Sequence, residues 1–207
     1  MDRKFTIFII ILLLLAAGGV FWWWTTKEKE PDVGFVRFEE FEIQETEDEK
    51  TIKHNEFGLK LTIPKDWEIV DGRDGLYFNS PDFEIDPIAG PYAPPIPEKG
   101  CVIKISIQKD INDVSYYTDY TYVNERIKIC LELLDYDCGY EVIEIDNNKA
   151  LKHISHVENE SILGDQVRIQ TPKNEKIYIF EAYLFGQDKE KCTQEFDKIL
   201  QTVEIRK

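Results

Sequence analysis

Apolar and polar side chains alternate along several short stretches of the chain, and the alternation predicts β-strands. Residues 57–63 and residues 101–108 both carry an apolar side chain at every second position. This period of two is typical of a strand with one buried face. In the second stretch the polar side chains, Lys104 among them, fall on the face opposite the apolar ones. Residues 76–79 form a third and shorter apolar stretch, for which we also expect a strand.

Two further pairs of stretches are separated by turn-forming residues, and each pair predicts a hairpin. The first pair is residues 140–145 and 150–157, joined by the sequence Asp-Asn-Asn-Lys. The second pair is residues 166–170 and 176–185, joined around the sequence Pro-Lys-Asn-Glu. Asp, Asn and Pro favour tight connections, because their backbones accept the conformations that turns need. Strands joined by hairpins pair as antiparallel neighbours.

Two other stretches have the period of a helix. Their apolar side chains recur at spacings of three and four residues, which places them on one helical face. The positions are Val123, Ile127, Leu131 and Leu134 in the first stretch, and Cys192, Phe196, Ile199 and Val203 in the second. We expect the second helix over residues 188–200, with a short tail near residues 203–205. Hairpin-linked strands and helices with one apolar face predict an α+β fold, an antiparallel sheet flanked by helices.

Residues 82–100 interrupt this pattern with turn-forming residues. Counted from Pro81, this part of the chain holds six of the nine prolines. Proline has no backbone N–H, so closely spaced prolines exclude a helix or a central strand. We therefore expect a surface loop.

Residues 5–24 form an apolar run without a charged side chain. At about 1.5 Å rise per residue the run can cross the ~30 Å hydrocarbon core of a bilayer. It ends in Trp22, Trp23 and Trp24, whose indole rings favour the membrane interface. The run predicts a single transmembrane anchor, and a signal peptide cleaved after Gly18 is the alternative.

The orientation of this anchor follows from the short tail before it, residues 1–4. Arg3 and Lys4 precede the apolar run, whereas Lys27 and Lys29 follow it, so the bias in positive charge is slight. A tail of a few residues before a long C-terminal domain is nevertheless typical of an N-in, C-out topology. We expect a single-pass protein of the cell membrane, with a cytoplasmic tail and an extracytoplasmic domain.

The stretch that follows the anchor is acidic. Residues 28–50 contain ten acidic and three basic residues, in a chain of formal net charge −15. We expect residues 25–50 to be an acidic linker that holds the soluble domain, residues 51–207, off an anionic membrane surface. An extra edge strand or a partner-docking motif is the alternative, because apolar residues punctuate the stretch. Nucleic acid is excluded as a partner, since so acidic a chain cannot neutralise phosphates.

Three segments of the soluble domain resemble the PsbP-like family. The segment EFGLKLTIPKDWEIV resembles the opening hairpin of these domains. The segment LYFNSP resembles their next strand, and the segment CTQEFDKILQTVEI resembles their closing helix. The resemblance covers residues 55–205, with residues 82–100 and the helix around residues 123–134 as insertions. It implies the α/β/α sandwich that PsbP, an extrinsic subunit of photosystem II, shares with the nuclear-transport factor Mog. It also implies a role in binding or assembly without catalysis.

Candidate metal ligands lie at the start of the proline-rich stretch. Asp82, Glu84 and Asp86 alternate there, and carboxylates suit a hard cation such as calcium. The glycine that an EF-hand loop needs is replaced by proline, so the pattern is not that of an EF-hand.

Three other titratable residues stand out by their positions. His153 and His156 form an H-x-x-H pair, but their odd spacing on a strand places the two rings on opposite faces. Glu181 falls in phase with the apolar side chains of residues 176–185. It is therefore a candidate buried carboxylate, and we expect it to be paired or to lie at the edge of a groove.

The four cysteines allow three disulfide connectivities in an exported domain. Cys130 and Cys138 are the best-placed pair, because only seven residues separate them. Cys101 and Cys192 lie on apolar faces and are interpreted as packed thiols. In a cytosolic domain all four would be free thiols.

The chain has no motif of a known catalytic site, such as G-x-S-x-G, a phosphate loop, a dinucleotide fingerprint or C-x-x-C. We expect a membrane-anchored module that binds a protein partner at the membrane surface, without catalysis and without a cofactor. The alternative is an anchored small-ligand-binding domain with residues 82–100 as its lid. It is suggested by nearby aromatic residues, which suit an apolar pocket: Tyr77, Phe78, Phe83 and Tyr92.

Overall fold

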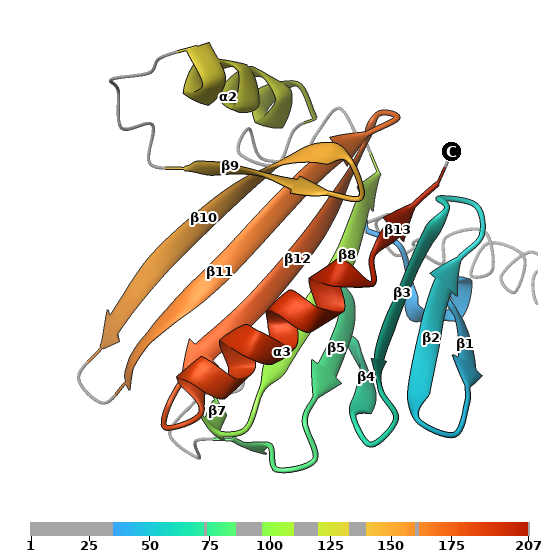
Figure 1. Ribbon diagram of the computed structural model, residues 1–207, viewed down its shortest axis with the longest axis vertical. Helices are drawn as coiled ribbons and strands as arrows, with labels where there is room; N and C mark the ends of the chain where they lie inside the picture. Colours follow the sequence, from blue (N-terminus) through green and yellow to red (C-terminus); the bar gives the residue numbers. More distant parts are fainter. Residues whose placement is uncertain are drawn as a thin grey trace, which may run out of the picture. The chain divides into compact units, whose positions relative to one another are not determined.

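The computed structural model describes residues 35–72, 74–85, 97–109, 120–132, 140–159 and 162–206. This part of the chain forms antiparallel sheets and two α-helices (Figure 1). The expected α+β class, with helices flanking an antiparallel sheet, is confirmed. Within the described ranges no helix has the length and apolar character needed to span a bilayer. The predicted anchor, residues 5–24, lies outside these ranges.

The larger sheet has seven strands, and every neighbouring pair is antiparallel. Its strands, in spatial order, are β4 (Glu68–Gly72), β5 (Gly75–Asn79), β8 (Val102–Lys109), β12 (Lys176–Phe185), β11 (Ile162–Lys173), β10 (Asn148–Asn159) and β9 (Glu141–Ile145). The strands expected at residues 76–79 and 101–108 are therefore confirmed as β5 and β8. Strand β12 lies at the centre of the sheet. Its neighbour on one side is β11, which precedes it directly in the chain, and its neighbour on the other side is β8, from a distant part of the chain.

Both predicted hairpins are confirmed, but their turns are tighter than the sequence suggested. Strands β9 and β10 are joined by Asp146 and Asn147, and strands β11 and β12 by Asn174 and Glu175. All four turn residues have positive φ, between 47° and 60°. Two consecutive residues with positive φ match the twist of the flanking strands, which is why Asn and Asp are favoured in such connections.

The smaller sheet has the order β1-β2-β3-β13 and uses part of the segment expected to be a linker. Its strands are β1 (Glu42–Glu45), β2 (Glu49–His54), β3 (Leu59–Pro64) and β13 (Glu204–Ile205). A short 3-10 helix, η1 (Phe38–Glu40), precedes them, and Val36 is buried in the core. From Phe35 on, the acidic segment is thus folded, and over β1 the edge-strand alternative is the one observed.

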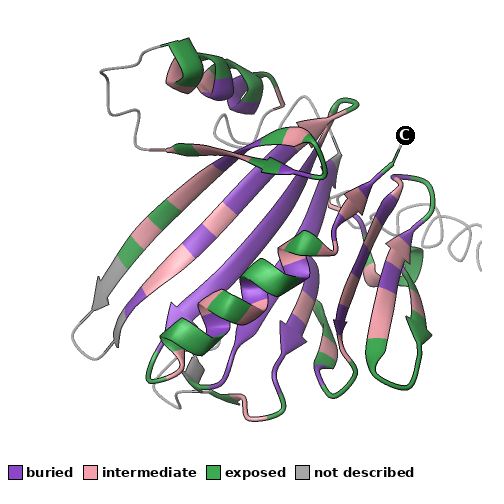
Figure 2. Ribbon diagram, in the orientation of Figure 1, coloured by how far each residue is buried: buried purple, intermediate pink, exposed green. Residues whose placement is uncertain are grey.

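Helix α3 (Lys189–Gln201) covers one face of the large sheet, which we term the α3 face (Figure 1). Its buried residues Cys192, Phe196 and Ile199 share one apolar core with the large and the small sheet. Figure 2 shows exposed residues on the outward side of this helix and buried residues along β8 and β12. The predicted closing helix and its tail, β13, are therefore confirmed.

Helix α2 (Tyr120–Glu132) packs on the opposite face of the large sheet, which we term the α2 face. There Val123 and Ile127 share an apolar cluster with Leu151 of β10 and with Ile177 and Ile179 of β12. The predicted helix is confirmed, but Leu131 of its apolar stripe is 44% exposed. The cluster under α2 is small, so it buries only the first two turns of that stripe.

The proline-rich stretch is anchored at both ends by a two-stranded ribbon. Strand β6 (Glu84–Ile85) pairs with β7 (Pro97–Lys99). Residues 86–96, which include most of the prolines, lie outside the described part of the chain. The expected surface loop is thus described only at its base.

Candidate functional site

Five side chains form one row across the α2 face of the large sheet. The strand register pairs Tyr77 with Lys104, Lys104 with Glu181, Glu181 with Arg168, and Arg168 with His153. Residues that pair across antiparallel strands project from the same face. We term Tyr77, Lys104, Glu181, Arg168 and His153 the charged row. Each member comes from a different strand, so only the folded sheet brings them together.

Glu181 is the centre of the charged row and is only 4% exposed. Its Oε2 atom lies 3.2 Å from Nζ of Lys104, and its Oε1 atom accepts a 3.1 Å hydrogen bond from Nε2 of Gln166. Nε of Arg168 lies 3.7 Å from the same Oε1 atom. The prediction that Glu181 is a buried and paired carboxylate is confirmed. Two cations and an amide together compensate the burial of its charge.

Lys104 is the buried cation of the row and is held by two carboxylates. Its Nζ atom lies 2.5 Å from Oδ2 of Asp74, in addition to its contact with Glu181. Burial acts to lower the pKa of Lys104, but the charges of Glu181 and Asp74 outweigh it and raise the pKa. The ammonium also lies 5.6 Å from the centre of the Tyr77 ring, and burial raises the pKa of that phenol. At neutral pH this end of the row is a fixed pattern of charge.

The other end of the charged row is histidine. Nδ1 of His153 lies 3.1 Å from Oγ of Ser155, and its ring lies 5.1 Å from the ring of Tyr140. His156 instead contacts Asp165, with 2.5 Å between Nδ1 and Oδ1. Both histidines belong to β10, three positions apart, so the predicted placement on opposite faces is confirmed.

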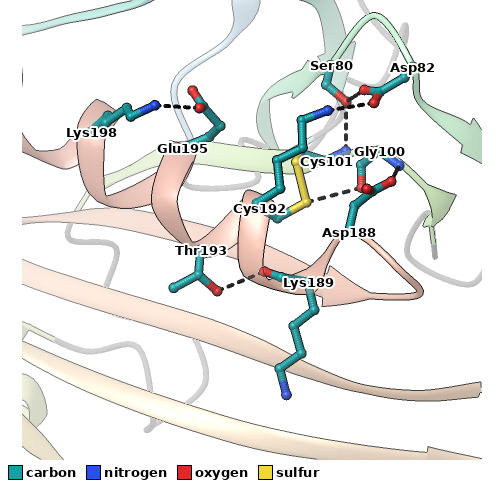
Figure 3. The surroundings of a disulfide bond; sticks show 11 residues. Ser80, Asp82, Gly100, Cys101, Asp188, Lys189, Cys192, Thr193, Glu195 and Lys198 are labelled. Atoms are coloured by element: carbon teal, nitrogen blue, oxygen red, sulfur yellow. Dashed lines mark hydrogen bonds and ion pairs between the residues drawn. A yellow bond between two sulfur atoms is a disulfide. The ribbon is translucent and has the colours of Figure 1, made fainter.

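A disulfide between Cys101 and Cys192 joins the start of β8 to α3 (Figure 3). Both residues are buried, and their Cα atoms lie 5.2 Å apart. The interpretation of these two cysteines as packed thiols is therefore wrong. The apolar pattern placed each residue on a buried face, but it could not show that the two faces meet. Cys130 is also disulfide-bonded, whereas Cys138 lies outside the described residues, so the pairing of these two stays a prediction.

Polar contacts surround the disulfide and fix the start of α3 (Figure 3). Asp82 accepts a 2.7 Å hydrogen bond from Oγ of Ser80 and lies 2.6 Å from Nζ of Lys191. The hydrogen bonds from Lys191 and Ser80 lower the pKa of Asp82 to about 2. On the other side, the N–H of Gly100 donates to Asp188, the residue before α3. Asp82 thus serves as an ionic anchor for the helix.

The predicted cation ligands are only partly described. Asp82 pairs with Lys191, Glu84 lies 3.7 Å from Nζ of Lys99, and Asp86 lies outside the described residues. Within the described ranges no group of three acidic, histidine or cysteine side chains is arranged to hold a metal ion. The cation site at Asp82, Glu84 and Asp86 stays a prediction.

Of the aromatic residues of the ligand-binding alternative that the structure describes, Tyr77 and Phe83 pack against one cluster and Phe78 lies apart from them. Tyr77 and Phe78 are neighbours in β5 and therefore face opposite sides of the sheet. Phe78 is buried in the core of the α3 face, whereas Phe83 packs near Tyr77 on the other side. Tyr92 lies outside the described residues, as do Trp22, Trp23 and Trp24 of the predicted anchor.

A groove of about 250 Å³ lies between the small sheet and α3. Its lining residues are Asp48, Glu49, Thr62, Ile63, Pro64, Glu195, Lys198, Ile199 and Thr202. Oγ1 of Thr202 accepts from the N–H of Thr62 and donates to Ile199, so this hydroxyl serves to join helix and sheet. Lys198 lies 2.7 Å from Glu195. These polar groups are used within the fold. In the charged row, by contrast, the side chain of Arg168 is 35% exposed and its Nε atom has no hydrogen-bond partner among the described residues, which makes the row the stronger candidate site.

Sequence reasoning identified Glu181 but missed its partners Lys104, Arg168 and Gln166, and it missed Asp74, which pairs with Lys104. The alternation of residues 101–108 placed Lys104 on one face of a strand, which is correct. The pattern carried no information on which strand lies next to which. One feature of the sequence could have pointed to the row. Glu181 occupies an apolar position of a very hydrophobic strand, and a carboxylate buried there needs a cation nearby.

No family model and no curated protein matches the chain. Among solved structures, it is similar to the solution structure of cyanobacterial PsbP (CyanoP) from Synechocystis sp. PCC 6803. The identity is 11%, the match covers 78% of this chain and 95% of that chain, and the TM-score is 0.48. It is also similar to a crystal structure from Bacteroides thetaiotaomicron VPI-5482, at 15% identity and a TM-score of 0.43. That match covers 72% of this chain and 46% of that chain, so this chain spans less than half of it. Both likenesses concern the fold.

Proposed function

We propose that this chain is a membrane-tethered extracytoplasmic module of PsbP-like fold that binds a protein partner and catalyses no reaction. In this proposal residues 5–24 are the tether, and Trp22, Trp23 and Trp24 lie at the membrane interface. The bilayer is one partner, and a protein at the membrane surface is the other. The module works without a cofactor.

The disulfide between Cys101 and Cys192 is the observation that carries the proposed location. Disulfides persist in oxidising compartments, whereas the cytosol keeps thiols reduced. A bond that joins residues 91 positions apart also favours a structural role, because it closes a long loop. This supports a domain that folds outside the cytoplasm.

The charged row supports recognition rather than catalysis. A general acid or base works best when its pKa lies near the working pH. The pKa values of Lys104 and Tyr77 are instead raised, further from neutrality. Glu181 is held by Lys104 and Gln166, so its oxygens are occupied by contacts within the sheet. Such groups present a fixed charge pattern to a bound molecule.

The first hairpin of the small sheet supports a domain held away from the lipid. Strands β1 and β2 and their turn expose an acidic set: Glu42, Glu45, Glu47, Asp48 and Glu49. Like charges repel this hairpin from an anionic bilayer surface. The repulsion would keep the surface of the domain free for a protein partner.

Two measurements on cells that express the full chain test the proposal. External protease on intact cells should remove the domain, and crosslinking before detergent extraction should recover one protein partner in stoichiometric amount. A catalytically silent domain with a specific partner is the expected result. Protection from external protease would overturn the location, and a purified chain that binds no protein but turns over a substrate would overturn the function.

A further inference from the structure

Among the residues that the structure describes, three buried polar atoms on the α2 face have no hydrogen-bond partner. They are Nε of Arg168, Nε2 of Gln170 and Oε1 of Gln108. Gln170 is 6% exposed and Gln108 is 3% exposed. Arg168 and Gln170 are two positions apart on β11, so their side chains project from the same face. The Cα atoms of the two residues are about 7 Å apart, so the side chains with unpartnered donors are neighbours on this face. Gln108 lies on the far side of β12.

Such groups require a physical explanation. A buried donor without a partner costs about 1–3 kcal/mol, and native structures contain few of them. The next polar side chain of β11 on this face is that of Gln166. Its amide has a hydrogen-bond partner, because it donates to Glu181. Arg168 and Gln170 thus form a local excess of donors on β11, whose other polar residue on this face, Gln166, has its partner.

The charges of the row leave Arg168 incompletely neutralised. Lys104 lies within 3.2 Å of Glu181 and 2.5 Å of Asp74, and so takes the near contacts of both carboxylates. Among the described residues, the ion-pair partner of Arg168 is Glu181, and their 3.7 Å separation is too long for a hydrogen bond. Its guanidinium therefore has both charge and donors to offer to another anion.

Arg168 and Gln170 differ in their exposure to solvent. The side chain of Arg168 is 35% exposed, so a ligand can reach it from solvent. Gln170 pairs in register with Leu151 on one side and Ile179 on the other. These two residues belong to the apolar cluster under α2. A ligand that passes Arg168 would thus meet an amide donor in an apolar setting.

We propose that Arg168 and Gln170 bind the carboxylate of a ligand, with Arg168 as the solvent-accessible contact and Gln170 as the buried one. A planar guanidinium matches a carboxylate in two-point geometry, and the buried amide adds a donor where water is excluded. Leu151 and Ile179 accommodate the apolar carbon next to the carboxylate. The same chemistry occurs in a free small acid and in the C-terminus of a protein partner.

Nuclear magnetic resonance of the side-chain nitrogens tests the proposal on the full chain in detergent micelles. Propionate is the small probe, because it offers a carboxylate with a short apolar tail. The expected result is a saturable shift of the Arg168 Nε–H and Gln170 Nε2–H signals in the millimolar range, with little change elsewhere. Two peptides of one sequence, one with a free C-terminal carboxylate and one amidated, are the probes for a protein source.

The outcomes separate the two sources. Saturation by propionate alone assigns the site to a free acid, and tighter saturation by the peptide with the free carboxylate assigns it to a protein C-terminus. If neither probe shifts the two signals, or if the amidated peptide shifts them equally, the proposal is wrong. The site does not depend on the membrane location. The protease experiment can therefore overturn the proposed location while carboxylate binding is still observed, and carboxylate binding can be absent while the proposed location is supported.

Variants distinguish a binding role from a structural one. Gln170→Leu removes an unpartnered amide, so without ligand the fold should be as stable as before or more stable. Carboxylate affinity should nevertheless fall at least about tenfold, because a hydrogen bond to a charged group is lost. Arg168→Gln should abolish binding, whereas Arg168→Lys should retain a weak, non-bidentate interaction. Gln44→Leu, at an exposed position of β1, is the matched control and should leave binding unchanged. Unchanged affinity in Gln170→Leu would overturn the role of this residue.

Discussion

The two faces of the large sheet are buried in different ways. On the α3 face, Phe78, Ile105 and Phe180 pack against apolar side chains of the common core. On the α2 face, neighbouring residues of the same strands include Lys104 and Glu181, which are also buried. The first face is stabilised by the removal of apolar surface from water, and the second by mutual pairing of charges that would otherwise be costly. A central strand can therefore be buried on both sides although one of its faces carries a charged residue, Glu181, between apolar residues such as Ile179 and Tyr183.

The largest effect is expected from a cavity on the α3 face. Phe180→Ala at the centre of β12 should lower the free energy of unfolding by roughly 3–5 kcal/mol, because the removed ring leaves a void between sheet and helix. Denaturant unfolding monitored by Trp67 fluorescence measures the loss. Val70→Ala in β4, where the side chain is partly exposed, is the control and should cost less than about 1 kcal/mol. Equal costs would show that the α3 face is not the main core.

The next effect concerns the disulfide, a covalent link on the α3 face. The double variant Cys101→Ala/Cys192→Ala should lower the free energy of unfolding by about 2–4 kcal/mol, because the unfolded chain gains loop entropy. Unfolding with and without reductant measures it. Reductant should destabilise the parent chain more than the variant, and an equal response in both would contradict a stabilising bridge.

On the α2 face, the comparison predicts that breaking a pair is worse than removing it. Glu181→Leu leaves Lys104 with the more exposed Asp74 alone, and should cost about 2–3 kcal/mol. The double variant Lys104→Met/Glu181→Leu removes both charges and should recover most of that loss. Denaturant midpoints of the three proteins form the measurement. If the double variant is as unstable as the single one, pairing is not what stabilises this face.

The smallest effect belongs to the ionic anchor at the edge of the α3 face. The pKa of Asp82 is about 2 in the folded protein, below its ordinary value of 3.8. A lowered carboxyl pKa stabilises the fold above the unfolded value, and the stabilisation is lost as the pH falls through the folded value. Because Lys191 and Asp82 are both partly exposed, Asp82→Asn should cost less than about 1 kcal/mol at about pH 6.

The pH dependence of this variant provides the check. The difference in urea midpoint between the parent chain and Asp82→Asn should shrink between about pH 4 and about pH 2, since the carboxylate becomes protonated there. A difference that persists at the lower pH would assign the effect to something other than the charge.

The pattern of side chains predicted local structure well, because a strand or helix imposes its period on the residues that belong to it. The hairpin turns could be located from Asn and Asp, which tolerate the positive φ found there. The strand β1 was not predicted as the leading interpretation, since its exposed glutamates give the composition of a linker. Its folding depends on pairing with β2, which no local pattern reveals.

The candidate site could be predicted only in part, for a related reason. The position of Glu181 showed that a carboxylate is buried, because burial of a side chain follows from the period of its own strand. Its partner Lys104 comes from β8, and the neighbourhood of β8 and β12 is a property of the whole topology. The same holds for Cys101 and Cys192, which meet only once α3 lies on the sheet.

The order of strands in the small sheet has a consequence for the time course of synthesis. Strand β3 receives its last neighbour from β13, and the pair Lys60 and Glu204 is separated by 144 positions. At roughly 5–20 residues per second, ribosomes need about 7–30 seconds to produce that interval. Throughout it β3 has a free edge, which is a template for any strand that arrives first. We therefore expect the nascent chain to be most prone to pairing with neighbouring chains during this interval, and this period ends when β13 pairs with Leu59 and Lys60 of β3.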